Sequence, residues 1–475
     1  MLFIAVTGSS FAQVVSPVDF MRYNSRAAFA NPAFYCHDYG YFDFALGGIN
    51  VGYQNIGLKY DKFFRFNSAG FPSTLTLDNG VASLRNTNYF NTYASIDVFN
   101  CGRRTKHGFF TYSHRFREWE TLRYSKDLFR LIAEGNSSFL GENSAKVDLG
   151  LSANAYQEFN FGYQMSLTEK LNIGARVKFL MGFANAKTND VNLQLFTDAD
   201  SYALRLIANA SAQAALPYQL VLRNGKIKIA DRRFNLANLF KNYGAGIDLG
   251  AEYKINDQFG VAAAVNDLGF ISWTNNTASL TAGIVDAGPY YQNGGLVFEG
   301  FTDAQVQAMI NDPSYLEHWL DTMMQYVSFD LTTGTKYTAG LNTSMMVRGY
   351  YDLTPEHRFS AQFMGFATGL GMKPAMTLAY TGSFAKKFDV VATYTMMPGS
   401  YDNIGVGLSA NLGSVTIYAA SNNVLGFINP VNISQVNLQF GLSFSAQEKV
   451  DRSETIILRD QARETEYQEP ESSVD

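Results

Sequence analysis

The chain has 475 residues and a formal net charge of −5, with 47% hydrophobic, 15% aromatic and only 17% charged residues. Soluble domains carry about a quarter charged residues, and disordered chains have few aromatics, so disorder is excluded and a soluble domain is disfavoured. No stretch of about 18 residues is free of polar groups, which excludes a bundle of membrane-spanning helices and favours a transmembrane β-barrel.

The first twelve residues resemble a signal peptide for export. An apolar run from Leu2 to Val6 precedes Ser10-Phe11-Ala12, whose small residues suit cleavage after Ala12. The usual basic start is missing, so the natural start is expected upstream. The alternative is an ordinary apolar N-terminus. An export signal without a later helical anchor predicts a protein of the cell envelope.

Residues 13–38 are predicted to form a plug, or hatch, within a barrel. Their central element is Asn31-Pro32-Ala33-Phe34. Pro32 lacks a backbone donor and has a fixed φ, which suits a kinked plug better than a strand. A barrel of about 14 strands encloses more space than its wall side chains fill, so such a plug would stop a leak. The alternative is that these residues are only a turn into the first strand.

Alternating apolar and polar residues predict the barrel, over residues 39–446. The clearest hairpin joins strands at 158–166 and 171–181 through the polar turn Thr168-Glu169-Lys170. Phe159, Phe161, Tyr163 and Met165 share one face of the first strand, and Asn160, Gly162, Gln164 and Ser166 share the other. Side chains alternate along a strand, so one face is expected to meet lipid and the other the lumen.

Further strands are predicted at 41–53, 92–99, 109–116, 243–255, 259–265, 337–351, 359–367, 388–396, 404–412, 415–419 and 436–444, with weaker ones near 58–66, 190–197 and 201–209. A soluble sandwich also alternates, but its strands are typically about 5–6 residues long and these are often longer. Aromatics at strand ends suit girdles at the membrane interfaces; they are Tyr41, Phe42, Tyr350, Tyr351, Phe384, Phe388, Tyr394 and Tyr401. The fold class is therefore all-β: an antiparallel transmembrane barrel of about 14 strands, with an N-terminal hatch and a helical insertion in a long loop.

Three long stretches, 117–146, 184–241 and 269–335, are expected to be loops at one end of the barrel. A short helix is predicted at 125–134. A helical insertion is predicted at about 302–327, from a capping box at Thr302 and Gln305 and a second start at Asp312-Pro313. Its apolar face includes Trp319, Met323 and Met324, which are expected either to pack on the barrel rim or to line a site for a hydrophobic ligand.

Charged residues on the polar faces are the next functional candidates. They are Arg176, Lys178, Asp248, Glu252, Lys254, Arg348 and Arg358. Ionisable groups at membrane depth usually pair or line a pathway, so the alternatives are a static ion-pair network and a conducting route.

The last 29 residues, 447–475, contain nine acids and four bases and are expected to be a charged periplasmic tail. The alternative is a docking peptide for a periplasmic or secretion-system protein. Cys36 and Cys101 could form a disulfide or remain separate thiols.

Motifs for chemistry are absent from the sequence. The five histidines show no metal-binding spacing, and no nucleophile elbow or phosphate-binding loop occurs, so no metal, cofactor or enzyme activity is expected. The body of the chain before the tail is neutral and lacks a basic face, which argues against nucleic acid.

Residues 22–35, RYNSRAAFANPAFY, resemble the start of FadL-like outer-membrane transporters, which place an Asn-Pro-Ala element in an N-terminal hatch. The matching residues are Asn31, Pro32 and Ala33. From about Val14 to Ala446 the chain is even more similar to a Bacteroidota family of outer-membrane barrels, with Gly174 to Phe179 (GARVKF) as a matching strand.

The FadL resemblance implies an outer-membrane barrel that binds fatty-acid-like or other hydrophobic molecules and releases them through a gap in its wall. A related branch instead implies a non-transport role in protein secretion or envelope assembly. The acidic tail departs from typical FadL-like barrels, whose chain ends at a terminal aromatic residue.

Overall fold

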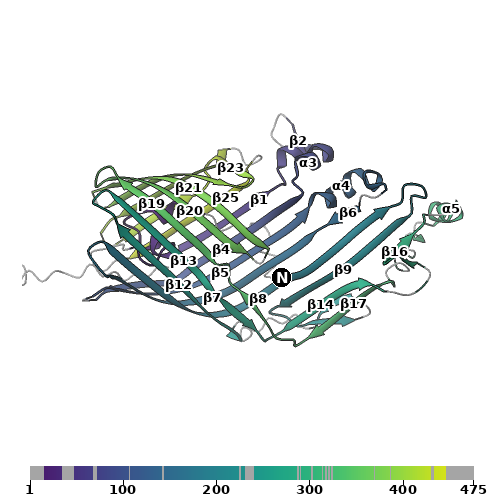
Figure 1. Ribbon diagram of the computed structural model, residues 1–475, viewed down its shortest axis with the longest axis horizontal. Coiled ribbons are helices and arrows are strands. Elements are labelled where there is room, and N and C mark those ends of the chain that lie inside the picture. The colour runs from purple at the N-terminus through teal and green to yellow at the C-terminus, as the bar shows by residue number, and fades with distance from the viewer. Residues whose placement is uncertain are drawn as a thin grey trace, which may run out of the picture.

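Fourteen antiparallel strands close into a ring in the described part of the chain, as the computed structural model shows (Figure 1). In ring order they are β1 (Gly48–Ile56), β4 (Thr87–Arg104), β5 (Phe109–Ser125), β7 (Leu149–Ser166), β8 (Leu171–Thr197), β12 (Asn242–Lys254), β13 (Phe259–Trp273), β19 (Ser344–Asp352), β20 (His357–Thr368), β21 (Gly371–Phe384), β22 (Phe388–Met397), β23 (Ser400–Asn411), β24 (Val415–Ser421) and β25 (Gln435–Phe444). The ring closes because β25 pairs with β1. The prediction of a barrel of about 14 strands is confirmed.

The structure describes residues 15–34, 48–67, 72–105, 107–141, 144–223, 226–230, 240–285, 288, 290–300, 303–312, 314–315, 318, 321, 325–368, 370–385, 387–413, 415–428 and 433–444. The predicted signal peptide and the predicted tail lie outside these residues. So does Cys36, and the disulfide with Cys101 stays a prediction; Cys101 lies in β4 opposite Tyr112.

The strands of the ring bury alternate residues, as the sequence pattern predicts. In β7, Phe161 is 50% exposed, whereas the preceding Asn160 is 1% exposed. In β8, Val177 is 58% exposed and Lys178 is 3% exposed. Apolar side chains therefore face outward and polar side chains face the lumen.

A band of apolar side chains covers the outer face of the ring. It includes Phe161, Val177, Leu249, Val261, Val347, Phe363, Leu378, Leu408, Ile417 and Leu438. A closed ring pairs its strands on both sides, which is the arrangement that lets strands cross hydrocarbon. The barrel therefore spans a membrane. None of the helices in the described residues is long and apolar enough to cross one.

Four of the aromatics expected in girdles are exposed: Phe384, Phe388, Tyr394 and Tyr401. The expectation is wrong for Tyr350, which is only 7% exposed. Its position in β19 falls on the lumen parity, where its ring lies 3.8 Å from the guanidinium carbon of Arg358. Tyr351 has the outward parity, and Tyr41 and Phe42 lie outside the described residues.

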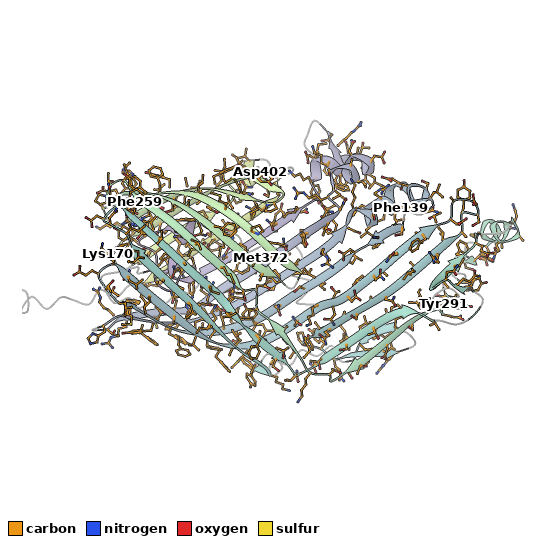
Figure 2. The ribbon with its side chains drawn as sticks, in the orientation of Figure 1. Phe139, Lys170, Phe259, Tyr291, Met372 and Asp402 are labelled. Carbon is orange, nitrogen blue, oxygen red and sulfur yellow. The ribbon has the colours of Figure 1, made fainter. Side chains whose placement is uncertain are left out.

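The two ends of the barrel differ in how they connect strands. One end has short turns of three or four residues, at 105–108, 167–170, 255–258, 353–356, 385–387 and 412–414. The other end has the long connections, at 57–86, 126–148, 198–241 and 274–343, together with a connection at 422–434 and two tight turns, at 369–370 and 398–399. Lys170 lies at the first end, and Phe139 and Tyr291 lie toward the other (Figure 2). The described segment of β1 starts, and that of β25 ends, at the short-turn end. A barrel strand was predicted near 58–66, but these residues belong to the long connection at 57–86, and that prediction is wrong. In the described residues this connection contains α2 (Tyr60–Phe63), β2 (Phe64–Phe66), β3 (Pro72–Leu75) and α3 (Leu77–Ser83).

The expectation of loops is wrong for much of 184–241 and 269–335, and for residues 117–125, which belong to β5. The weaker strands predicted near 190–197 and 201–209 are confirmed, within β8 and within the strand at 204–215. β12 leaves β8 at Gly182, and β9 (Leu204–Ala215) pairs with the rest of β8 from Asn185 onward. β14 (Thr277–Ile284) pairs with β9, and β17 (Val327–Thr333) pairs with β14. These strands extend the sheet well beyond the ring, at the right of Figure 1. Their small and mixed side chains, as in ANASAQAA at residues 208–215, lack the alternation that identifies a membrane strand.

Smaller elements complete the long-loop end. They are α4 (Lys126–Glu134), η3 (Ser137–Phe139), β6 (Ser144–Val147), β10 (Leu220–Arg223), β11 (Lys226–Ile229), β15 (Tyr291–Gln292), β16 (Gly295–Phe298), α5 (Asp303–Asn311), β18 (Tyr337–Gly340) and α7 (Leu425–Ile428). α4 confirms the short helix predicted at 125–134. α5 confirms the start of the predicted insertion at 302–327, which ends where β17 begins at Val327.

Sequence patterns missed β21 entirely. Pro374 lies inside this strand, and a proline usually argues against a strand because it cannot donate to the ladder. Pro374 pairs with Gly365 of β20, whereas β22 pairs with β21 only from Met376 onward. The proline is tolerated because β21 lacks a second neighbour at that point.

An arginine at the middle of the outer face should destabilise the barrel far more than one at its edge. Leu378→Arg, in the centre of β21, is expected to lower the free energy of unfolding in lipid vesicles by about 2–4 kcal/mol. Leu412→Arg, at a short turn, should cost no more than about 1 kcal/mol. Denaturant titration of both variants checks this, and equal losses would contradict the assigned membrane depth.

Candidate functional site

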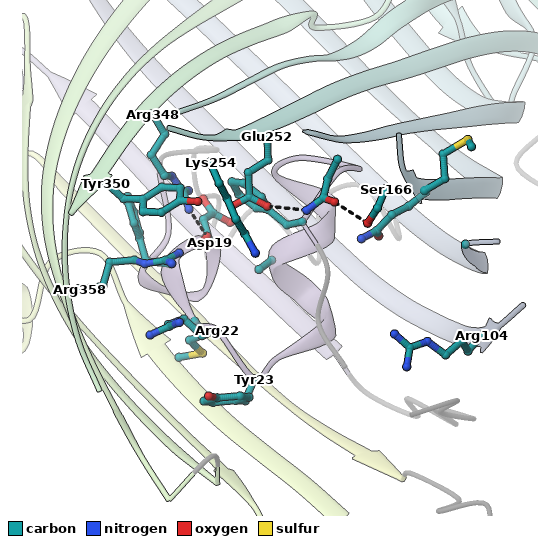
Figure 3. Close-up of a pocket in the computed structure, with 18 of the residues that line it drawn as sticks. Asp19, Arg22, Tyr23, Arg104, Ser166, Glu252, Lys254, Arg348, Tyr350 and Arg358 are labelled. Atoms are coloured by element: carbon teal, nitrogen blue, oxygen red, sulfur yellow. Dashed lines mark hydrogen bonds between the residues drawn. The ribbon is translucent and has the colours of Figure 1, made fainter. Parts of the chain in front are cut away.

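The hatch segment, defined here as residues 15–34, lies inside the ring (Figure 3). It contains two 3-10 helices, η1 (Pro17–Phe20) and η2 (Ser25–Phe29). Ser16 and Asn24 cap them by accepting hydrogen bonds from the backbone N–H groups of Val18 and Arg26. Such caps and a proline in the first turn explain why the sequence turns helical here.

The Asn31-Pro32-Ala33 element forms a turn. The Asn31 Oδ1 atom accepts a hydrogen bond of 2.8 Å from the N–H of Ala33. The Asn31 Nδ2 atom donates to the carbonyl oxygens of Ala251 and Ala263, each at 3.2 Å, and so joins β12 to β13. Asn31 is completely buried. One side chain thus shapes the turn and fastens it to the wall, an arrangement that fits the predicted hatch.

Glycines in the wall make room for this turn. A Cβ atom at Gly250 would lie 1.9 Å from the Asn31 Oδ1 atom, and one at Gly174 would lie 2.2 Å from the carbonyl oxygen of Pro32. No real Cβ approaches other atoms so closely, so the wall and the hatch segment can touch only where a residue lacks Cβ. Gly174 belongs to the GARVKF strand noted in the sequence.

Charged residues hold one side of the hatch segment. The Arg26 guanidinium pairs with Asp97 of β4, and the Nη2 atom of Arg176 donates to the carbonyl oxygen of Ala28 at 2.7 Å. Neither arginine is more than 5% exposed. A buried arginine with a carboxylate or carbonyl partner is costly to release, so this side is fixed.

These contacts belong to a network of nine buried or nearly buried charges, defined here as the charge network. Its ion pairs are Arg26–Asp97, Arg115–Asp97 at 2.6 Å, Arg115–Glu158 at 3.4 Å, Arg117–Glu158 at 3.3 Å, Arg117–Asp267 at 2.8 Å, Lys178–Asp267 at 2.5 Å, Lys178–Asp248 at 2.9 Å and Arg176–Asp248 at 2.9 Å. It spans β4, β5, β7, β8, β12 and β13 and fills that half of the lumen.

Of the seven predicted lumen charges, three lie in this network: Arg176, Lys178 and Asp248. Sequence reasoning missed Arg115, Arg117 and Glu158, although they share the lumen parity of their strands. Nothing in the pattern indicates Asp267, whose φ of 59° marks a bulge where the alternation breaks.

The remaining four predicted charges, Glu252, Lys254, Arg348 and Arg358, line a large cavity at the short-turn end, called here the vestibule (Figure 3). Its volume is about 1050 Å³. Six cationic side chains line it, Arg22, Arg104, Lys254, Arg348, Arg358 and Lys387, against three acidic ones, Asp19, Glu169 and Glu252.

Arg348 forms the boundary between the vestibule and the hatch segment. Its Nη1 atom donates to the carbonyl oxygen of Asp19 at 2.9 Å, and its guanidinium carbon lies 4.1 Å from the ring centre of Phe20 and 4.8 Å from that of Phe34. Burial raises the pKa of the Asp19 carboxyl group, in the hatch segment, to about 6, although the charge of Arg348 opposes the rise.

A second, smaller cavity of about 180 Å³ lies at the long-loop end and is called here the mouth cavity. Apolar side chains dominate its lining: Ile56, Trp119, Phe366, Met372, Met397 and Pro398. Lys373 also lines it, with its Nζ atom 2.7 Å from the Asn91 Oδ1 atom. The predicted ligand residues Trp319, Met323 and Met324 lie outside the described residues. The residues that line the mouth cavity were not predicted from the sequence.

The chain matches the family of unknown function DUF5723 over residues 32–422. It belongs to that family. The match covers Asn31-Pro32-Ala33 only from Pro32 onward, and it extends through most of the ring, to the end of β24.

Solved structures similar to this chain include three barrels. A toluene transporter of Ralstonia pickettii, TbuX, is 11% identical over 92% of this chain and 96% of its own, with a TM-score of 0.42. A mutant of the monoaromatic hydrocarbon channel TodX is 11% identical over 93% and 98%, with a TM-score of 0.41. A Pseudomonas aeruginosa FadL homologue is 9% identical over 92% and 100%, with a TM-score of 0.39. No curated protein matches the chain.

Gly174→Ala should displace the hatch segment, because the new Cβ meets the backbone of Pro32. We expect the variant to conduct ions several-fold more than the unaltered barrel in planar bilayers. The control is Gly349→Ala in β19, since no atom lies within 4 Å of a Cβ there. Equal conductance in both variants would contradict a lumen closed by this segment.

Asp267→Ala removes the carboxylate that pairs with both Arg117 and Lys178, and so leaves these two buried cations with fewer anionic partners than they have now. Breaking a buried pair costs about 3–5 kcal/mol of folding free energy. Arg130→Ala removes an exposed pair on α4, Arg130 with Glu134 at 3.2 Å, and should cost less than about 1 kcal/mol. Unfolding in detergent measures both, and similar small losses would show that the charge network does not stabilise the barrel.

Proposed function

We propose that this barrel lies in the outer membrane, binds hydrophobic small molecules in the mouth cavity and passes them along the hatch segment toward the periplasm. The short-turn end faces the periplasm in this proposal, because outer-membrane barrels have short periplasmic turns and long outer loops. The observation that carries it is an apolar cavity at the outer mouth that connects to an apolar seam beside the hatch segment.

The apolar seam is the packed contact of Val18, Phe20 and Met21 of the hatch segment with Met346, Met364 and Val391 of the wall. Phe366 packs against the seam and also lines the mouth cavity. At the opposite end, Phe34 packs against the seam and lines the vestibule. A hydrophobic molecule therefore has apolar contacts along this side of the lumen.

The two sides of the hatch segment differ in how they are held. The charge network and Asn31 fasten one side with buried ion pairs. Apolar packing holds the seam side, together with hydrogen bonds that join the hatch segment to the wall residues Arg348, Thr381, Asp389, Ser409 and Gln439. Apolar contacts re-form with an apolar ligand, whereas buried ion pairs have no substitute, so the seam is the side expected to yield. Passage would need only a limited shift of the hatch segment.

The volume of the mouth cavity supports a small ligand. A cavity of about 150 Å³ in another protein holds one benzene molecule, so the mouth cavity suits one ring or a short alkyl segment. A fatty-acid-like chain would have to extend from it into the seam. Gln54, Arg85, Asn91, Asn342 and Lys373 also border the cavity, and an apolar lining with several convergent polar groups is typical of ligand sites.

Met397→Gln should weaken binding of an apolar probe about tenfold, because the amide, which can pair with Gln54 where the Met397 sulfur now accepts from its Nε2 atom, replaces an apolar contact of the probe with a polar group. Fluorobenzene is a suitable probe, followed by ¹⁹F NMR with the purified barrel. The control is Met345→Gln, which lies 52% exposed on the outer face of β19. Identical binding to all three proteins, or none to any, would contradict a ligand site in the mouth cavity.

A further inference from the structure

The vestibule has an excess of positive charge that its own acids do not neutralise. Among its six cations, Arg358 forms two hydrogen bonds of 2.7 Å with Asp352, and Arg348 lies buried beneath the hatch segment. Lys254 and Lys387 are exposed and form no ion pair with an acid in the described residues. The cavity therefore offers at least two available ammonium groups beside partly satisfied guanidinium groups.

The end of β25 places the C-terminal segment beside this cavity. Phe444, the last residue of β25, pairs with Val415, the first residue of β24. The turn before Val415 contributes Asn411 and Gly413 to the lining of the vestibule. The chain therefore leaves the ring at the edge of the vestibule.

The sequence beyond this point has the opposite charge. Residues 464–475, ETEYQEPESSVD, contain five acids and no base. Nineteen residues, 445–463, separate Phe444 from Glu464, and a random-coil linker of that length has a root-mean-square reach of roughly 25 Å. This reach suffices for the acidic residues to return to the vestibule.

We propose that the vestibule binds the acidic segment 464–475 of the same chain. Two observations identify this segment as the occupant of the vestibule: its charge is opposite to that of the cavity, and β25 ends at the edge of the cavity. The proposal does not depend on what the mouth cavity binds.

Tethering decides whether such binding is strong enough. An exposed ion pair contributes about 1 kcal/mol or less, so the free segment would bind weakly. A short flexible connection raises the effective concentration to the millimolar range, which allows weak pairs to hold the segment in place. Salt screens such pairs, with a Debye length of about 3 Å at 1 M, so the contact should open at high salt.

Carbodiimide cross-linking of the full chain in detergent, mapped by mass spectrometry, tests the proposal. The reagent joins lysine amines to carboxylates that they contact. We expect links from Lys254 or Lys387 to Glu464, Glu466, Glu469 or Glu471 at low salt, and their loss at 1 M salt. Lys146 and Lys336, at the long-loop end, are internal controls and should form no such links.

A benzophenone side chain in place of Tyr467 in the full chain gives a readout that needs no carboxylate, because benzophenone links to nearby C–H groups under light. A quadruple variant of that chain, Glu464→Gln, Glu466→Gln, Glu469→Gln and Glu471→Gln, should lower its photo-links to the vestibule lining at least several-fold at low salt. Undiminished photo-links in the quadruple variant would overturn the role of charge.

Mixing ¹⁵N-labelled and unlabelled full chains identifies the source of the bound segment. Links within one copy support the proposal. Links mainly between labelled and unlabelled copies would overturn it in favour of docking between two chains. Tail links to control lysines as frequent as those to Lys254 and Lys387 would overturn it altogether.

Discussion

A strand in hydrocarbon must pair its backbone groups on both sides, and this constraint determines the rest of the structure. Closing the ring satisfies it, but fourteen strands enclose a lumen wider than the wall side chains alone can fill. Two parts of the protein occupy that lumen: the charge network of wall side chains, and the hatch segment near the N-terminus. Each depends on the other, since Arg26 of the hatch segment completes the network through Asp97.

The filling is asymmetric, and the asymmetry underlies the proposed function. Ion pairs and the side chain of Asn31 fix the hatch segment to the strands from β4 to β13. On the opposite side, Met346 and Met364 contact its apolar face, and hydrogen bonds such as that from Thr381 to the carbonyl oxygen of Phe20 take the place of buried ion pairs. Methionine side chains adapt to irregular neighbours, so this side can exchange one apolar contact for another. The mouth cavity and the vestibule lie at the two ends of this adaptable side.

Much of the barrel follows from the sequence because a membrane strand exposes one face to lipid and one to the lumen. The hairpin around residues 167–170 could be predicted to the residue, and lumen parity alone places Arg115, Arg117 and Glu158. The bulge at Asp267 breaks that parity, and Pro374 conceals a strand, because both depend on neighbours far away in sequence. In the outer extension the pattern indicates only weak strands near 190–197 and 201–209, because small and mixed side chains such as those of residues 208–215 do not alternate.

The site is less predictable than the wall. The Asn-Pro-Ala turn could be predicted as a kinked element, but its fit against Gly174 and Gly250 depends on packing between distant segments. The mouth cavity combines Trp119 with Met372 and Met397, which come from strands on different parts of the ring, so no local motif marks it.

The central claim is that the mouth cavity and seam hold a hydrophobic molecule. Mass spectrometry of small molecules retained by the protein tests it directly, with protein purified from its own membrane in mild detergent beside an unrelated barrel treated identically. We expect one apolar compound, near stoichiometric with this protein and depleted in the control. The same bulk lipids in both samples, with no specific compound, would contradict the claim.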